Sequence, residues 1–154
     1  MKTKRAARTV IVDENGLIAL ISVRGGEYYK IPGGGIEAEE SERTAARREA
    51  LEEAGCKINI IRKIGEQQFV DNDPERGTTK HHSVCFLARK TTQHETSFDD
   101  WEQSNDMKLI WVDLETAKKL FASGKPVGNF CTSIHNRDFE FVLKGMEIYK
   151  TIQD

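Results

Sequence analysis

One helical segment most constrains what this chain can fold into. Residues 41–54 are rich in Ala, Arg, Glu and Leu, which favour the α-helix, and Ser41 and Gly55 stand where an N-cap and a left-handed stop are expected. The segments before and after this helix are short, apolar and rich in β-branched residues, which indicates strands. This pattern is typical of a protein that combines strands and helices.

The rest of the chain divides by the same criteria. Residues 7–12 and 17–23 are predicted to form a hairpin, because Asn15-Gly16 between them is a strong turn signal. Further strands are predicted at 28–31, 58–70, 83–89 and 109–112, further helices at 113–123 and 136–152, a flexible loop at 33–35 and a polar loop at 71–80. The apolar stripe of the last helix is interpreted as core packing and consists of Phe139, Val142, Leu143, Met146 and Tyr149.

Length and charge narrow the class of protein. The chain has 154 residues, with 23 Lys plus Arg and 25 Asp plus Glu, so its formal net charge is −2. We expect a single domain over residues 1–154, long enough to bury its own core. This net charge does not indicate the basic surface that nucleic-acid binding needs.

No apolar run approaches the roughly 20 residues that span a bilayer. Three widely spaced cysteines are expected as reduced thiols, and we therefore expect a cytoplasmic protein.

Three carboxylates share one face of the first predicted helix. Glu49, Glu52 and Glu53 are spaced i, i+3, i+4, which places them within an arc of roughly 100°. Like charges at this spacing destabilise an isolated helix by roughly 0.2–0.5 kcal/mol per pair, so a cation should offset them. One interpretation is a solvated acidic face on which Arg48 pairs with Glu52. The other is a metal site.

The glycines before this helix favour the metal site. Gly33, Gly34 and Gly35 allow a ligand to approach the backbone closely, and a loop beside carboxylates suits Mg²⁺, which binds carboxylates, waters and substrate phosphates. The segment lacks the Lys-Ser/Thr pair of a P-loop and the glycine spacing of a dinucleotide-binding motif. The combination predicts metal-assisted phosphate chemistry.

These residues resemble a known family. Gly34, five residues, Glu40, seven residues and then Arg48-Glu49-Ala50-Leu51-Glu52-Glu53-Ala54-Gly55-Cys56 match the Nudix box at every charged and glycine position. The flanking hairpin, the later strands and the terminal helix are also similar to those of a whole Nudix domain. Ala50 and Cys56 depart from the pattern, since larger aliphatic residues are commoner there. The resemblance implies the α/β Nudix fold, a mixed β-sheet sandwiched between helices (α/β/α).

The resemblance also implies an activity and the residues that carry it. Members of this family hydrolyse a nucleoside diphosphate linked to another group, with Mg²⁺ or Mn²⁺ as cofactor. The implied metal ligands are Glu49, Glu52, Glu53 and the Gly33 carbonyl; the implied catalytic residues are Glu49 as the base, Arg48 and Glu52; and the implied supporting residues are Gly34, Gly35, Glu40 and Gly55. Glu102 and Asp106 are either additional ligands or ordinary exposed loop acids.

Substrate preference is the least determined property. The chain lacks a clear marker of the ADP-ribose, dinucleoside polyphosphate or NADH enzymes of the family, and its small size is similar to the MutT-type branch, which acts on nucleoside triphosphates or their oxidised relatives. Hydrolysis of ADP-ribose or nucleotide sugars, and a binding-only nucleotide sensor, remain alternatives. The expected partner is a small nucleotide, and the sequence leaves a homodimer open.

Five side chains are candidates for substrate contacts: Arg24, Tyr28, Tyr29, Asn129 and Asp106. Arg24 suits bidentate phosphate binding or a solvated hairpin end. Because neighbouring residues of a strand alternate faces, we expect one of the two tyrosines to stack on a base and the other to face the core. Asn129, expected just before the last helix, suits a purine edge or an Asx-turn.

Overall fold

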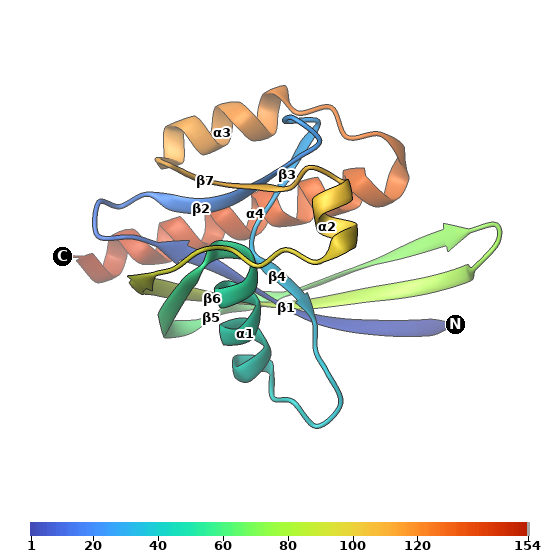
Figure 1. Cartoon of the computed structure of the whole chain (residues 1–154), viewed down its shortest axis with the longest axis horizontal. Coiled ribbons are helices and arrows are strands. Elements are labelled where there is room, and N and C mark those ends of the chain that lie inside the picture. Colours follow the sequence, from blue (N-terminus) through green and yellow to red (C-terminus); the bar gives the residue numbers. More distant parts are fainter. Residues whose placement is uncertain (154) are drawn as a thin grey trace.

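The strands form one mixed sheet in the computed structural model, which describes residues 1–153 (Figure 1). The strands are β1 (Lys2–Val12), β2 (Ile18–Val23), β3 (Tyr28–Lys30), β4 (Gly33–Gly35), β5 (Cys56–Asp73), β6 (Gly77–Gln93) and β7 (Lys108–Val112). The helices are α1 (Glu42–Ala54), α2 (Asp100–Ser104), α3 (Leu114–Ser123) and α4 (Gly128–Gln153). The central strand order is β3-β2-β1-β6-β5, with β4 paired to β1 and β7 paired to β2. β1 and β6 are parallel, and the other pairs are antiparallel.

Alternate residues of the central strands face two separate cores. Val10 and Val12 of β1 pack in a cluster with side chains of α3 and α4, whereas Ile11 between them packs in a cluster with Ala50 and Ala54 of α1. This is the period-two pattern of a sheet that is covered on both faces. In Figure 1, α1 lies in front of the sheet and α4 behind it. The expected α/β/α arrangement is therefore confirmed.

Local signals placed the turn of the first hairpin and the first helix correctly, although β1 begins at Lys2 and not near residue 7. The Asp13 carboxylate accepts hydrogen bonds from the N–H groups of Asn15 and Leu17, each at 2.8 Å, and this holds the turn between β1 and β2. Ser41 accepts from the Thr44 N–H at 3.1 Å and caps α1. Gly55 ends α1 with φ 63°, a left-handed conformation that favours glycine.

Two segments predicted as loops are strands. Residues 71–80 continue the antiparallel pairing of β5 and β6 out to Asp73 and Gly77, so only a short turn joins these strands. The polar composition misled the prediction because this arm projects away from the core and both of its faces are largely solvated (Figure 1). The 33–35 segment is not a flexible loop but β4, paired with residues 6–8 of β1.

The helices after β6 also differ from the prediction. α2 was missed, and α4 begins at Gly128 rather than near residue 136, so Asn129 lies in its first turn. Leu143 is 37% exposed and lies outside the buried stripe that includes Val142, Met146 and Tyr149. Within residues 1–153, no helix combines the length and apolar character needed to cross a membrane.

Candidate active site

Helix α1 presents two of its glutamates to the protein interior. Its small residues, Ala46 and Ala50 among them, pack closely on the sheet, and the same face carries Glu49 and Glu53. The residues Glu49 and Glu53 are only 8% and 1% exposed. The interpretation of α1 as a solvated acidic face is therefore wrong for these two carboxylates.

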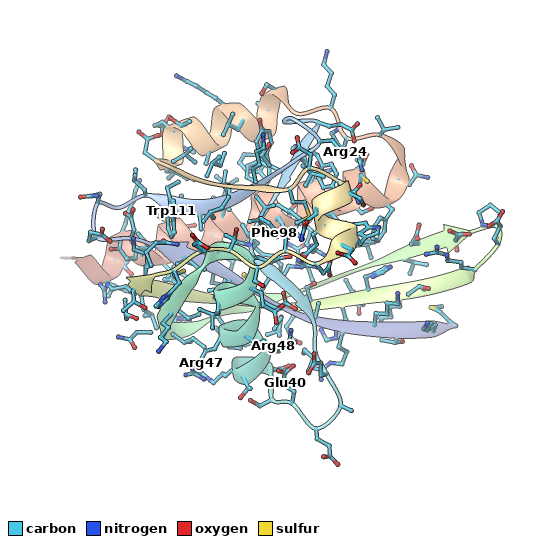
Figure 2. All side chains as sticks on the ribbon, viewed as in Figure 1. Arg24, Glu40, Arg47, Arg48, Phe98 and Trp111 are labelled. Atoms are coloured by element: carbon cyan, nitrogen blue, oxygen red, sulfur yellow. The ribbon has the colours of Figure 1, made fainter. Side chains whose placement is uncertain are left out.

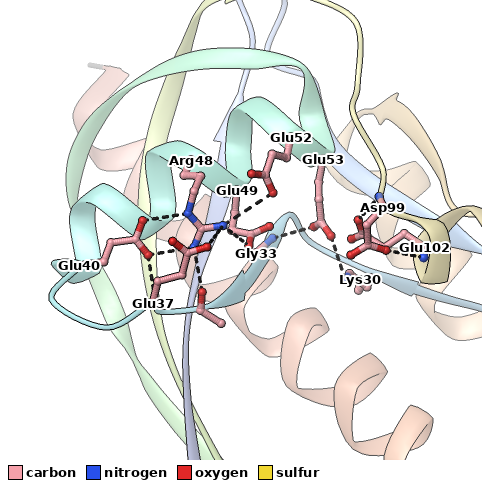
Figure 3. Close-up of polar contacts among 11 residues, drawn as sticks. Lys30, Gly33, Glu37, Glu40, Arg48, Glu49, Glu52, Glu53, Asp99 and Glu102 are labelled. Carbon is pink, nitrogen blue, oxygen red and sulfur yellow. Dashed lines mark hydrogen bonds and ion pairs between the residues drawn. The ribbon is translucent and has the colours of Figure 1, made fainter.

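Strand β4 holds these carboxylates through its glycines. The Gly33 N–H donates a hydrogen bond to Glu53 Oε1 at 2.9 Å. A Cβ atom on Gly34 would collide with the Glu49 carboxylate, so the missing side chain allows that carboxylate to lie against the strand. The glycine segment and the helix thus form one structural unit (Figure 3).

Arg48 joins the helix to the segment that precedes it. Its guanidinium donates two hydrogen bonds to the Glu40 carboxylate, at 2.8 and 2.9 Å, one to Glu49 Oε1 at 2.8 Å and one to the Gly35 carbonyl at 2.9 Å. The bonds from Arg48 lower the pKa of Glu40 to about 2. The more exposed Glu52 lies 3.7 Å from the guanidinium. Arg48 therefore fixes the position of Glu49 as well as the conformation of the loop.

A fourth carboxylate approaches from α2. Asp99 and Glu102 form a reciprocal capping box at the start of this short helix, which directs Glu102 toward Glu53 (Figure 3). Burial, and then contact with Glu53, raises the pKa of Glu102 to about 8. Interpreting Glu102 as an ordinary exposed loop acid is therefore wrong. The Asp-x-x-Glu spacing at 99–102 was the sequence signal for this helix start.

The negative charges of this cluster are only partly balanced. Lys30 Nζ lies 3.6 Å from Glu53, and Arg48 bonds Glu49. Burial, and then the charge of Glu53, nevertheless raises the pKa of Glu49. In residues 1–153, no three His, Cys, Asp or Glu side chains already converge as a preformed metal site. The concentration of hard oxygen donors with excess negative charge nonetheless fits Mg²⁺ or Mn²⁺, and Glu49, Glu52, Glu53 and Glu102 are the side chains that could hold the ion.

A cavity of about 280 Å³ opens beside these carboxylates. Its polar wall includes Glu49, Glu52, Glu53, Glu102, Lys30 and Arg8 together with the three glycines of β4. The rest of its lining is largely apolar and aromatic and includes Tyr28, Trp101, Met107, Phe130 and Ile134. The sequence carries no signal that Trp101 and Phe130 are site residues, because nothing in it places α2 and the start of α4 beside α1.

Of the five candidate substrate contacts, only Tyr28 lines this cavity. Tyr29 packs in the core against Phe121, so the expectation that one tyrosine faces the core is confirmed. Arg24 donates to Glu27 and Asn105 and lies at the upper side of the molecule in Figure 2, away from Arg48.

The other two candidates also lie outside the cavity. Asp106 is exposed, with Lys108 3.8 Å away. Asn129 lines a separate hollow beside the β5–β6 turn. Hydrogen bonding of Asn129 to a purine edge stays a prediction.

Comparison with known proteins identifies the class to which this fold and site belong. A family model described as "NUDIX domain" matches residues 2–128. The chain therefore belongs to the Nudix family.

Individual relatives agree with this assignment. Diphosphoinositol polyphosphate phosphohydrolase 2 of Rattus norvegicus is 32% identical over 116 residues, which cover 74% of this chain and 59% of that protein. Diphosphoinositol polyphosphate phosphohydrolase 3-alpha of Mus musculus is 34% identical over 116 residues, which cover 74% of this chain and 65% of that protein. The match thus spans less than two-thirds of either relative.

Solved structures share the fold. A Nudix hydrolase from Nitrosomonas europaea superposes with a TM-score of 0.61 at 17% identity, covering 90% of this chain and 89% of that one. A MutT protein from Methanosarcina mazei Go1 gives a TM-score of 0.62 at 19% identity, with 95% of each chain covered.

Proposed function

We propose that this protein is a divalent-metal-dependent hydrolase of phosphoric anhydride bonds in small molecules. The observation that carries the proposal is the burial of Glu49 and Glu53 against the glycines of β4, beside Glu102 and an open cavity. Burying carboxylates without full neutralisation destabilises a fold, so such clusters are typical of functional sites. We propose that residues 1–154 act as one catalytic unit.

The side chains of this cluster have distinct proposed roles. When bound, Mg²⁺ or Mn²⁺ supplies neutralisation of diphosphate charge and lowers the pKa of a bound water. Glu52, Glu53 and the Gly33 carbonyl would hold the ion together with Glu49, and Glu49 would accept the proton of the attacking water. We propose that Arg48 orients Glu49. The hydrogen bond of 2.8 Å from its guanidinium to Glu49 Oε1 supports this role.

The supporting residues keep this arrangement in place. Glu40 anchors Arg48 through two hydrogen bonds, and Gly34 leaves the space that the Glu49 carboxylate occupies. The Gly35 carbonyl accepts from Arg48, and Gly55 ends α1 just after Glu52 and Glu53.

We favour a nucleoside triphosphate, or an oxidised relative, as the substrate. Tyr28, Trp101 and Phe130 give the cavity an aromatic wall, which suits a planar base, while the carboxylate wall suits the phosphates through the metal. ADP-ribose and nucleotide sugars also fit this cavity, because each contains a planar base and a diphosphate. A diphosphoinositol polyphosphate is the second candidate, favoured by the names of the relatives at 32–34% identity.

A hydrolysis screen tests this proposal. The purified protein is incubated with Mg²⁺ or Mn²⁺ and each of dGTP, 8-oxo-dGTP, dCTP, ADP-ribose, a nucleotide sugar and a diphosphoinositol polyphosphate. We expect hydrolysis of a phosphoric anhydride bond, with the highest kcat/KM for a nucleoside triphosphate. Binding of a nucleotide without hydrolysis of any compound would instead support the sensor alternative.

Cellular setting and assembly are also proposals. The cysteines Cys56, Cys85 and Cys131 are free thiols, which supports a reducing compartment such as the cytoplasm. A homodimer remains a hypothesis that the molar mass in solution would test.

A further inference from the structure

Two arginines, one on β1 and one on α4, carry buried guanidinium nitrogens, and the first of them lines the proposed catalytic cavity. Arg8 lies on β1 and lines that cavity, and its Nε donates to Ser83 Oγ at 3.2 Å. Arg137 lies deeper on α4, where it is 5% exposed, and its Nε donates to Asp138 Oδ1 at 2.7 Å. Burial, and then the positive charge of Arg137, lowers the pKa of the Arg8 guanidinium. The charge of Arg137 therefore makes the protonated form of Arg8 less favourable.

Both guanidinium groups have hydrogen-bond donors without an acceptor. Among the described residues, no acceptor forms a hydrogen bond with Arg8 Nη1 or Arg137 Nη2, although both atoms are buried. A guanidinium carries five N–H donors, and leaving a buried donor unpaired is unfavourable, more so for a charged group. The site therefore lacks an acceptor.

The nearby acids do not supply that acceptor. Asp138 is fully buried, and its two oxygens already accept from Arg137 Nε and from the Ile31 N–H. Glu53 is held by the Gly33 N–H and faces Lys30. Both acids are thus engaged elsewhere, and the buried nitrogens of Arg8 and Arg137 are left for an acceptor that the described residues do not provide.

The missing side chain of Gly33 also leaves space for Arg8 beside β4. Arg8 pairs with Gly33 in the β1–β4 register, and a Cβ atom on Gly33 would lie 2.6 Å from Arg8 Cγ. The Arg8 side chain therefore passes directly beside the strand that holds Glu53. A group bound by Arg8 would lie in the same cavity as a substrate diphosphate held at the glutamates.

We propose that Arg8, backed by Arg137, binds a phosphate group of the substrate other than the two joined by the bond that is cleaved. This inference rests on the proposed function. A phosphate group accepts bidentate hydrogen bonds from a guanidinium and supplies the missing acceptor. The group is either the remaining phosphate of a nucleoside triphosphate or a ring phosphate of a polyphosphorylated substrate. The site thereby selects against substrates that contain a diphosphate alone.

Titration with inorganic phosphate tests the binding directly. Calorimetry is carried out in EDTA, so that no metal-bound phosphate contributes, on the wild type, on Arg8→Met and on Arg62→Met, which removes an exposed arginine of β5. We expect phosphate to bind the wild type and Arg62→Met equally, and Arg8→Met at least about tenfold more weakly, since a charged hydrogen bond is lost. Arg8→Lys keeps the positive charge but loses the planar guanidinium, so its affinity for phosphate should lie between those of the wild type and Arg8→Met. This variant replaces Arg8→Met in the test if Arg8→Met does not fold. Equal affinity for wild type and Arg8 variants, or no binding to the wild type, would overturn the inference.

Steady-state kinetics then distinguish the sources of the phosphate. In Arg8→Met we expect KM to rise for dGTP or for a diphosphoinositol polyphosphate, whichever places its further phosphate at Arg8, and to stay unchanged for ADP-ribose, which has none. An equal rise for ADP-ribose would mean that Arg8 binds the cleaved diphosphate itself, against the inference. If no compound is hydrolysed, the proposed function fails, while the phosphate titration still decides the role of Arg8.

Discussion

The chemistry proposed here depends on single carboxylates whose surroundings differ although they share one helix. Glu52 remains partly exposed, whereas Glu53 is buried between Gly33, Lys30 and Glu102. Burial weakens the screening of its charge by water, so Glu53 interacts strongly with any cation in the cavity. The contribution of Glu53 to binding a metal should therefore exceed that of Glu52.

Substitution of Glu53 tests this view. Glu53→Gln keeps the shape and an oxygen that can accept from Gly33, but removes the negative charge, so kcat should fall by at least roughly 10²-fold. The variant should stay folded, because the loss of the ion pair with Lys30 is offset by the loss of charge repulsion between Glu53 and Glu49. Kinetics and a melting curve are compared with Glu115→Gln on the remote helix α3. Unfolding of Glu53→Gln with full activity in its folded fraction would assign Glu53 a structural role only.

A second prediction concerns Glu40 and acid stability. The pKa of Glu40 is about 2 in the folded protein, against 4.5 ordinarily, because Arg48 stabilises the charged form. A lowered pKa contributes stability above about pH 4.5 that is lost as the pH falls toward 2. In Glu40→Gln the free energy of unfolding should therefore be lower at neutral pH and decline less steeply over this range.

Denaturant unfolding at a series of pH values measures the effect. Glu95→Gln, an exposed substitution outside the cavity, is the control and should follow the wild type. Parallel curves for wild type and Glu40→Gln across the acid range would contradict the prediction.

At the scale of elements, α2 determines whether Glu102 faces the glutamates of α1. The helix has five residues and no buried side chain, so its capping box is a large part of what holds it. Asp99 makes the same type of N-cap for α2 that Asp113 makes for α3, a helix remote from the cavity. The two caps therefore form a matched pair.

Removal of either cap separates stability from activity. Asp99→Ala and Asp113→Ala should each reduce the free energy of unfolding by about 0.5–2 kcal/mol. Only Asp99→Ala should also lower kcat/KM, because Glu102 and Trp101 lose their positions in the cavity. Melting curves and kinetics are measured on both variants, and an equal loss of kcat/KM in both would show that α2 has no special role.

At the scale of the whole molecule, the cavity is formed by β1, β3, β4, α1, α2 and α4 together. A divalent ion bound there would connect α1 to α2 through their glutamates and would stabilise the folded state by mass action. Its effect should thus be visible in stability as well as in catalysis.

Metal removal tests this expectation. EDTA should abolish hydrolysis of any substrate found, and excess Mg²⁺ or Mn²⁺ should restore it. The same ions should raise the melting temperature of the wild type, and raise that of Glu53→Gln less. Activity that persists undiminished in EDTA would refute the proposed mechanism, and EDTA already saturated with Mg²⁺ controls for effects of the chelator.

The sequence by itself determined the parts of this protein that depend on local interactions. The turn at Asn15-Gly16, the cap at Ser41, the stop at Gly55 and the spacing of the glutamates on α1 follow from residues only a few positions apart. The Nudix box and the α/β/α fold could be inferred for the same reason, because the motif is one continuous segment.

Only the tertiary structure decided what is made from distant segments. It placed Glu102 of α2 against Glu53, and it brought Phe130 of α4 and Arg8 of β1 to the wall of one cavity. It also moved Asn129 into a helix and out of the cavity. Burial, charge and contact at these positions depend on how the sheet brings separate elements together, and a local sequence pattern contains no such information.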